Sequence, residues 1–137
     1  YMTEYPSIRY VIDVHRDSVT DASGNLLRAV TELDGEAMAQ VLCVVGTGET
    51  ATNCPWMYNY TLAQWLRGAL NERSSRVCRP TVLRSSSYNQ QYAEMSLLLE
   101  IGTSGNTLAE AQRAARLVGA ALVNLLTTCN GTDLAGG

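Results

Sequence analysis

The fold is decided by the stretch Ser96-Leu97-Leu98-Leu99-Glu100-Ile101-Gly102, which is apolar except for one carboxylate. A run of this length that ends in glycine predicts a buried strand. Thr107 and Glu110 follow it with the spacing of a capping box, so we expect a helix to begin there. The helix carries one apolar stripe, formed by Leu108, Ala111, Ala115, Val118, Leu122 and Leu125. Glu110 is expected to lie away from that stripe.

Outward from this unit, three more segments are typical of strands, at residues 8–14, 40–46 and 80–83. A weaker alternation at 27–33 predicts a short strand, and a helical period begins near residue 59. Apolar strands that alternate with amphipathic helices indicate an α/β sandwich whose sheet is covered on both faces. We expect one domain over residues 1–128, followed by a tail at 129–137.

Composition excludes several classes of protein. The 137 residues are 46% apolar, enough for the core of one domain. The net charge of −3 and the pI near 5.0 argue against nucleic acid as a partner, because no basic surface is available to neutralise phosphates. No apolar run reaches the roughly 18 residues that a membrane span needs.

Two residues stand where an open α/β sheet places its sites, at the carboxyl ends of strands. His15 follows the first strand and Glu100 lies near the end of the last one. If the two strands run parallel in one sheet, both side chains converge on the same edge. A carboxylate within Leu97–Ile101 is costly to bury without a partner, which favours a functional role. His15 is the single histidine, so it does not supply a complete zinc site by itself.

Other chemistries have weaker support. No GxSxG motif is present for a serine triad. Four cysteines, Cys43, Cys54, Cys78 and Cys129, form no CxxC pair. Any of them is open as a nucleophile beside His15, although Cys43 lies in an apolar run and is expected in the core.

Several motifs occur together in a familiar order. They are Tyr5-Pro6-Ser7-Ile8, Val11-Ile12-Asp13-Val14-His15-Arg16-Asp17, Val44-Val45-Gly46-Thr47, Arg79-Pro80-Thr81-Val82-Leu83-Arg84, Tyr88-Asn89-Gln90, and Ser96–Gly102 running on to Gly105-Asn106-Thr107-Leu108-Ala109-Glu110-Ala111. Over residues 5–126 the chain thereby resembles the stage II sporulation protein P family.

The resemblance implies a phosphorylase/hydrolase-like α/β fold, a sheet flanked by helices, as in the N-acetylmuramoyl-L-alanine amidases. These are zinc enzymes that cut peptidoglycan between the lactyl group and L-alanine, and this family is also credited with cleaving peptide cross-links. By motif, His15 corresponds to the last histidine ligand of Zn²⁺ and Glu100 to the catalytic carboxylate. Arg84 and Asn89 are candidates for binding substrate along a glycan-peptide groove.

The family also has features that this sequence lacks. Its first histidine and a glutamate ligand lie upstream of the segment matched here, as does its membrane anchor. The resemblance therefore implies a domain truncated at its N-terminus, incomplete for catalysis, from an extracytoplasmic, membrane-anchored parent. Expected partners are peptidoglycan and stage II sporulation protein D, and an uncovered sheet edge predicts dimerisation. Two alternatives stay open: a non-catalytic wall-binding or scaffold domain, and a cytosolic hydrolase with a cysteine nucleophile.

Overall fold

A computed structural model describes residues 1–48, 55–93 and 95–129. Along the chain the elements are β1 (Tyr10–Asp17), β2 (Val30–Leu33), β3 (Glu36–Ala39), β4 (Val41–Gly46), α1 (Trp56–Asn71), β5 (Val82–Arg84), β6 (Met95–Thr103) and α2 (Leu108–Cys129). The tail predicted at 129–137 lies, beyond Cys129, outside the described residues.

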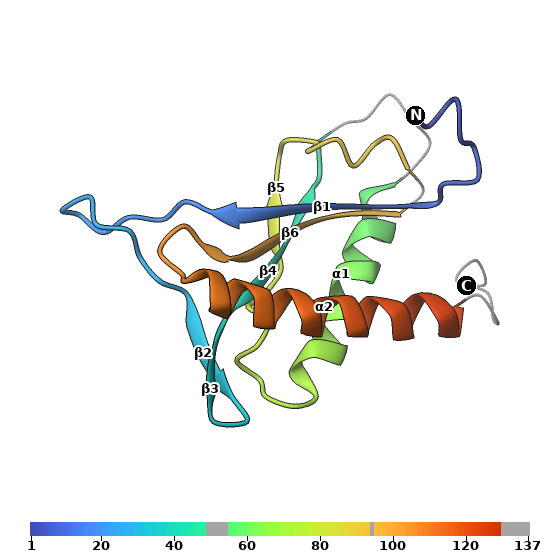
Figure 1. Cartoon of the computed structure of the whole chain (residues 1–137). Coiled ribbons are helices and arrows are strands. Elements are labelled where there is room, and N and C mark those ends of the chain that lie inside the picture. Colours follow the sequence, from blue (N-terminus) through green and yellow to red (C-terminus); the bar gives the residue numbers. More distant parts are fainter. Residues whose placement is uncertain (49–54, 94, 130–137) are drawn as a thin grey trace.

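Four strands form a mixed sheet in the order β1-β6-β4-β5, so the α/β class is confirmed (Figure 1). β1 pairs parallel with β6, β6 pairs antiparallel with β4, and β4 pairs parallel with β5. β1 extends to Asp17, three residues beyond the predicted range, and therefore includes His15. β1 and β5 are the outer strands of this sheet; the dimer expected from an uncovered edge stays a prediction.

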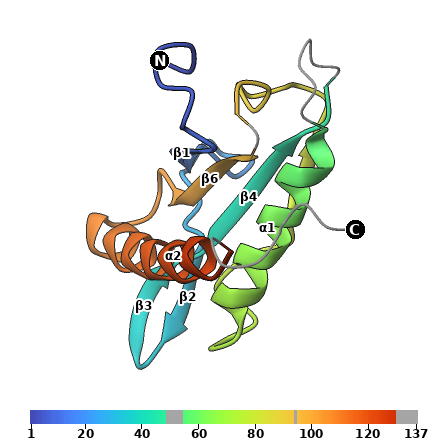
Figure 2. The same cartoon turned by 90° about the vertical axis from the view of Figure 1, so that its right-hand side faces the viewer.

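Both helices cover the same face of the sheet, which corrects the expectation of helices on both faces (Figure 2). Odd-numbered side chains of β4 and β6 pack against α1 and α2, and Cys43 and Leu99 among them are fully buried. On the opposite face, Leu42, Val44 and Leu98 form a separate small cluster and are only 6–8% exposed. A strand that is apolar at every position indicates that both of its faces are buried from solvent. It does not indicate that a helix covers each face.

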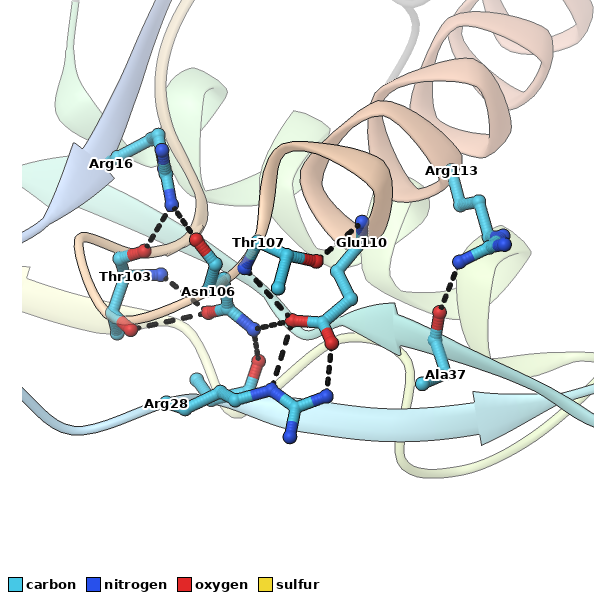
Figure 3. A network of polar contacts seen from close by, with 9 residues as sticks. Arg16, Arg28, Ala37, Thr103, Asn106, Thr107, Glu110 and Arg113 are labelled. Atoms are coloured by element: carbon cyan, nitrogen blue, oxygen red, sulfur yellow. Dashed lines mark hydrogen bonds and ion pairs between the residues drawn. The ribbon is translucent and has the colours of Figure 1, made fainter.

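The weak strand predicted at 27–33 is one arm of a hairpin. β2 pairs antiparallel with β3, and the two are joined by Asp34 and Gly35, which have φ angles of 54° and 80°. Positive φ at both central residues is the geometry that an Asp-Gly pair favours in tight hairpins. β3, which leads almost directly into β4, was not predicted. Arg113 of α2 contacts β3 by donating to Glu36 Oε2 at 3.0 Å. It also donates to the Ala37 carbonyl at 3.0 Å (Figure 3).

The capping box that begins α2 is confirmed. The Glu110 N–H donates to Thr107 Oγ1 at 3.3 Å, and the Thr107 N–H donates to Glu110 Oε2 at 3.1 Å. Glu110 is nevertheless only 3% exposed, contrary to its expected place on an outward face. Arg28 forms a two-pronged ion pair with its carboxylate, and Asn106 Nδ2 donates to it at 2.9 Å (Figure 3). These partners allow burial of the charge, because each carboxylate oxygen has a donor.

A second set of contacts joins the ends of β1 and β6. Arg16 Nη2 donates to the carbonyls of Thr103, at 2.8 Å, and of Asn106 (Figure 3). The Asn106 side chain accepts from the Thr103 N–H at 2.8 Å and donates to the Ala29 carbonyl at 2.9 Å. The residue that follows His15 is therefore anchored to the turn between β6 and α2. This anchor fixes the edge of the sheet where both strands end.

Candidate functional site

His15 and Glu100 lie side by side. They are register partners on the parallel strands β1 and β6, although 85 residues separate them in the chain. Residues in register on adjacent strands project from the same face of a sheet. Because Glu100 also pairs with Leu42, both side chains lie on the face that the helices leave uncovered. The predicted convergence at the carboxyl ends of two strands is thus present in the structure.

The imidazole of His15 is oriented by a neighbouring carboxylate. His15 Nε2 lies 2.8 Å from Asp13 Oδ1, and both side chains are about half exposed, at 49% and 45%. Asp13 and His15 share a face because they are two residues apart on a strand. With Nε2–H donating to Asp13, the lone pair of the neutral ring is on Nδ1, where it is available to a cation or a proton.

Glu100 is held in a partly desolvated position. Its Oε2 atom is shielded from solvent and has no hydrogen-bond partner among the described residues. Desolvation by burial raises the pKa of Glu100, and the carboxylate of Asp17 raises it further. The charges of His15 and Arg79 oppose this shift. A carboxyl group with a raised pKa exchanges protons more readily near neutral pH, which suits a general acid or base.

Arg79 is a member of the site that sequence reasoning missed. Its Nη2 lies 3.8 Å from Asp17 Oδ2, and its backbone N–H donates to the Val41 carbonyl at 2.8 Å. Nε and Nη2 are buried without a hydrogen-bond partner in the described part of the chain. The sequence feature that could have indicated Arg79 is its position in the motif Arg79–Arg84. That motif supports the family resemblance but gives no role to Arg79. The site thus combines three carboxylates with one guanidinium and one imidazole.

The two predicted substrate-binding residues have different locations. Asn89 lines a hollow of about 220 Å³ that Asp13 also lines, so it lies next to the site. Arg84 is exposed at the end of β5, in register with Gly46. Since β4 pairs Leu42 with Glu100, Gly46 is four residues farther along β4, roughly 13 Å away from the site. Arg84 does not join the cluster.

The turn that carries Asn89 is attached to the sheet by Gln90, a second residue that sequence reasoning missed. Gln90 Nε2 donates to the Val44 carbonyl at 2.8 Å, and its Oε1 accepts from the Gly46 N–H at 3.0 Å. The Gln90 side chain therefore makes hydrogen bonds to the backbone of β4 that a neighbouring strand would otherwise make. The residue is only 4% exposed. Tyr88 and Asn89 both have positive φ, at 52° and 58°. Such side-chain pairing with a strand has no simple sequence signature.

The predicted zinc site is compared here with the residues that the structure describes. In ranges 1–48, 55–93 and 95–129, no group of three or more His, Cys, Asp or Glu is placed to hold an ion. The carboxylate behind His15 is nevertheless the arrangement that orients histidine ligands in metal proteins. One oriented imidazole fits the role of a single ligand, and zinc binding by this chain stays a prediction.

Burial argues against the cysteine alternative for two of the four thiols. Cys43 and Cys78 are 0% and 1% exposed, and Cys43 points to the helix-covered face, away from His15. Burial of Cys43 in the core is as predicted. Cys54 and the side chain of Cys129 lie outside the described residues. In the described part of the chain, no helix combines the length and apolar character needed to cross a bilayer.

Comparison with known proteins gives one consistent result. The family model of stage II sporulation protein P (SpoIIP) matches residues 1–123. The chain is 30% identical over 114 residues to stage II sporulation protein P of Bacillus subtilis (strain 168), with 80% of this chain and 26% of the relative covered. It therefore spans about a quarter of that relative's length. No solved structure gives a significant match. The motifs and the α/β fold are consistent with the family match, which covers most of this chain. This chain therefore belongs to the stage II sporulation protein P family.

Proposed function

We propose that this chain is part of a peptidoglycan hydrolase that acts as a zinc-dependent N-acetylmuramoyl-L-alanine amidase and as an endopeptidase on peptide cross-links. Membership of the sporulation family supports the class of protein. The observation that carries the proposal is the register pairing of His15 with Glu100 at the ends of two parallel strands. This pairing places an oriented imidazole beside a carboxyl group of raised pKa.

In this proposal the residues have distinct roles. Zn²⁺, when bound, acidifies a water molecule and polarises the scissile carbonyl. His15 would supply one ligand to the ion, and Asp13 keeps the ring in the tautomer that leaves Nδ1 free for this role. Glu100 accepts a proton from the attacking water and returns it to the departing amine, which its elevated pKa favours. Arg79 limits the repulsion between Asp17 and Glu100, so that the site tolerates two close carboxylates.

The cellular setting follows from the same proposal. Peptidoglycan lies outside the cytoplasmic membrane, so the protein would act there, held by an anchor elsewhere in its parent. Stage II sporulation protein D is a proposed partner during engulfment. A second copy of the chain, bound at the outer edge of β1, is a further candidate partner, because an edge strand offers unpaired backbone groups.

A non-catalytic wall-binding or scaffold domain remains the second candidate. It is favoured by the incomplete ligand set among the described residues. The two functions are separated by digesting purified peptidoglycan and labelling newly exposed amino groups of L-alanine. The polypeptide encoded by the whole gene is compared with its Glu100→Gln and His15→Ala variants, with Glu36→Gln as an exposed control. Release of L-alanine amino termini that both site variants abolish supports the amidase; sedimentation with peptidoglycan without release supports the binding domain.

A further inference from the structure

Two buried cysteines meet in the core on the helix-covered side of the sheet, away from the candidate site. Cys43 lies in β4, Cys78 lies in the segment between α1 and β5, and both belong to one hydrophobic cluster. Cys78 forms an isolated parallel bridge with Val41. Val41 and Cys43 share a sheet face because they are two residues apart on a strand. The two cysteines are therefore diagonal neighbours on one face, although they are 35 residues apart in the chain.

The two thiols contact each other directly. The Cys43 S–H donates to the sulfur of Cys78, and the two are separate thiols in the structure. This hydrogen bond lowers the pKa of Cys78 against the effect of burial, and the positive charges of Arg67 and Arg79 lower it further. Side chains whose sulfur atoms meet satisfy one requirement of a disulfide, which is that their Cβ atoms point toward each other.

The backbone around Cys78 is held in place independently of its thiol. The Cys78 N–H donates to Asn71 Oδ1 at 2.8 Å, and Asn71 Nδ2 donates to the Cys78 carbonyl at 3.0 Å. On either side, the Val41 N–H donates to the Val77 carbonyl and the Arg79 N–H donates to the Val41 carbonyl, both at 2.8 Å. A bond between the sulfur atoms would therefore join two segments that the fold already aligns.

We propose that Cys43 and Cys78 form a disulfide in the folded protein, which cross-links β4 to the segment that carries Arg79. The two thiols lose two protons and two electrons, and the electrons reduce the disulfide of a thiol oxidant, a small molecule or an enzyme, to two thiols. Because both cysteines are buried, the bond forms while the chain folds, and the core then shields it from reductants. The oxidising surroundings come from the proposed location outside the cytoplasm, so the assignment rests in that respect on the proposed function.

The test uses a chain with Cys54→Ser and Cys129→Ser, in which Cys43 and Cys78 are the remaining cysteines. The chain is diluted from urea into mixtures of reduced and oxidised glutathione, or kept in urea with the same mixtures, and free thiols are counted by alkylation and mass spectrometry. A disulfide that stabilises the folded chain is favoured by the same factor when the chain is folded, so we expect oxidation to be about 30-fold or more favoured there. The oxidised protein should melt roughly 6–20 °C above the reduced one. Adding Cys78→Ala should abolish this difference between oxidising and reducing conditions.

Equal or weaker oxidation in the folded chain, or glutathione attached to either cysteine as the end product, overturns the disulfide. The unaltered chain, refolded in oxidised glutathione, gives a second measurement that does not depend on how the variants fold. Cleavage after arginine and glutamate residues separates Cys43 from Cys54 at Glu49, and mass spectrometry should then identify a peptide pair joined through Cys43 and Cys78. Any other pairing, or none, overturns the assignment. Both measurements are independent of hydrolysis, so this disulfide in a protein that releases no L-alanine amino termini refutes the amidase and retains the cross-link.

Discussion

Replacement of Gly46 by alanine tests how the turn that carries Asn89 is attached to the sheet. A Cβ atom at Gly46 would lie 2.3 Å from the Ser86 carbonyl oxygen and 2.8 Å from that of Ser87. Both atoms belong to the backbone, so the segment before the turn must move instead of a flexible side chain. Overpacking of this kind costs about 1–3 kcal/mol. For a chain of this size we expect the melting temperature to fall by roughly 4–12 °C.

Gly68→Ala is the matched control, because a Cβ atom there meets nothing within 4 Å. Gly68 lies within α1, where alanine is expected to stabilise by about 0.5–1 kcal/mol. Unfolding of the three proteins is followed by circular dichroism during heating and in urea. Gly46→Ala also strains the hydrogen bond from the Gly46 N–H to Gln90, so the Asn89 amide signal should shift. A Gly46→Ala protein as stable as the original, with an unchanged Asn89 signal, would refute this close approach.

Three further predictions concern single side chains. Glu110→Gln should lower the free energy of unfolding by about 1–3 kcal/mol at pH 7, because Arg28 loses a charged partner. The pKa of Glu110 is lowered from 4.5 to about 2, so its stabilisation is complete above about pH 4.5 and is lost as the pH falls toward 2. Urea unfolding across this range should show the two proteins converging, and a constant difference would contradict the ion pair. Asn59→Ala should cost about 1–3 kcal/mol in urea unfolding by leaving the buried Ser96 N–H without its acceptor, and a cost below about 0.5 kcal/mol would refute that role. NMR titration of carboxyl carbons should place the pKa of Glu100 above 4.5 and lower it in Asp17→Asn; a normal pKa that does not respond would remove the electrostatic argument for this site.

The elements that sequence predicted well are those with a strong local pattern. The strand around Leu99 and the capping box of Thr107 and Glu110 each depend on neighbouring residues, and the structure contains both. The parallel alignment of His15 with Glu100 was inferred from topology, because strands of an α/β sheet bring their carboxyl ends to one edge. The roles of these two residues in binding metal and transferring protons stay predictions.

The features that could not be predicted from the sequence are contacts between residues far apart in the chain. Arg28 neutralises Glu110 across 82 residues, which converts an apparent surface glutamate into a buried one. Gln90 replaces a strand beside β4, and Arg79 reaches Asp17 from a segment far along the chain. A polar residue has no periodic signature for such contacts, since its partner is set by the fold. For the same reason, the apolar strands did not disclose that both helices occupy one face.

The central claim is that His15 and Glu100 form one catalytic unit, and a double-mutant cycle on hydrolysis tests it most directly. The rate of L-alanine amino-terminus release is measured for the gene-encoded polypeptide, for His15→Ala, for Glu100→Gln and for the double variant. Each single change should reduce the rate at least about 100-fold, and the double variant should be no slower than the worse single one. Independent effects that multiply, or a Glu100→Gln protein with full activity, would contradict the claim.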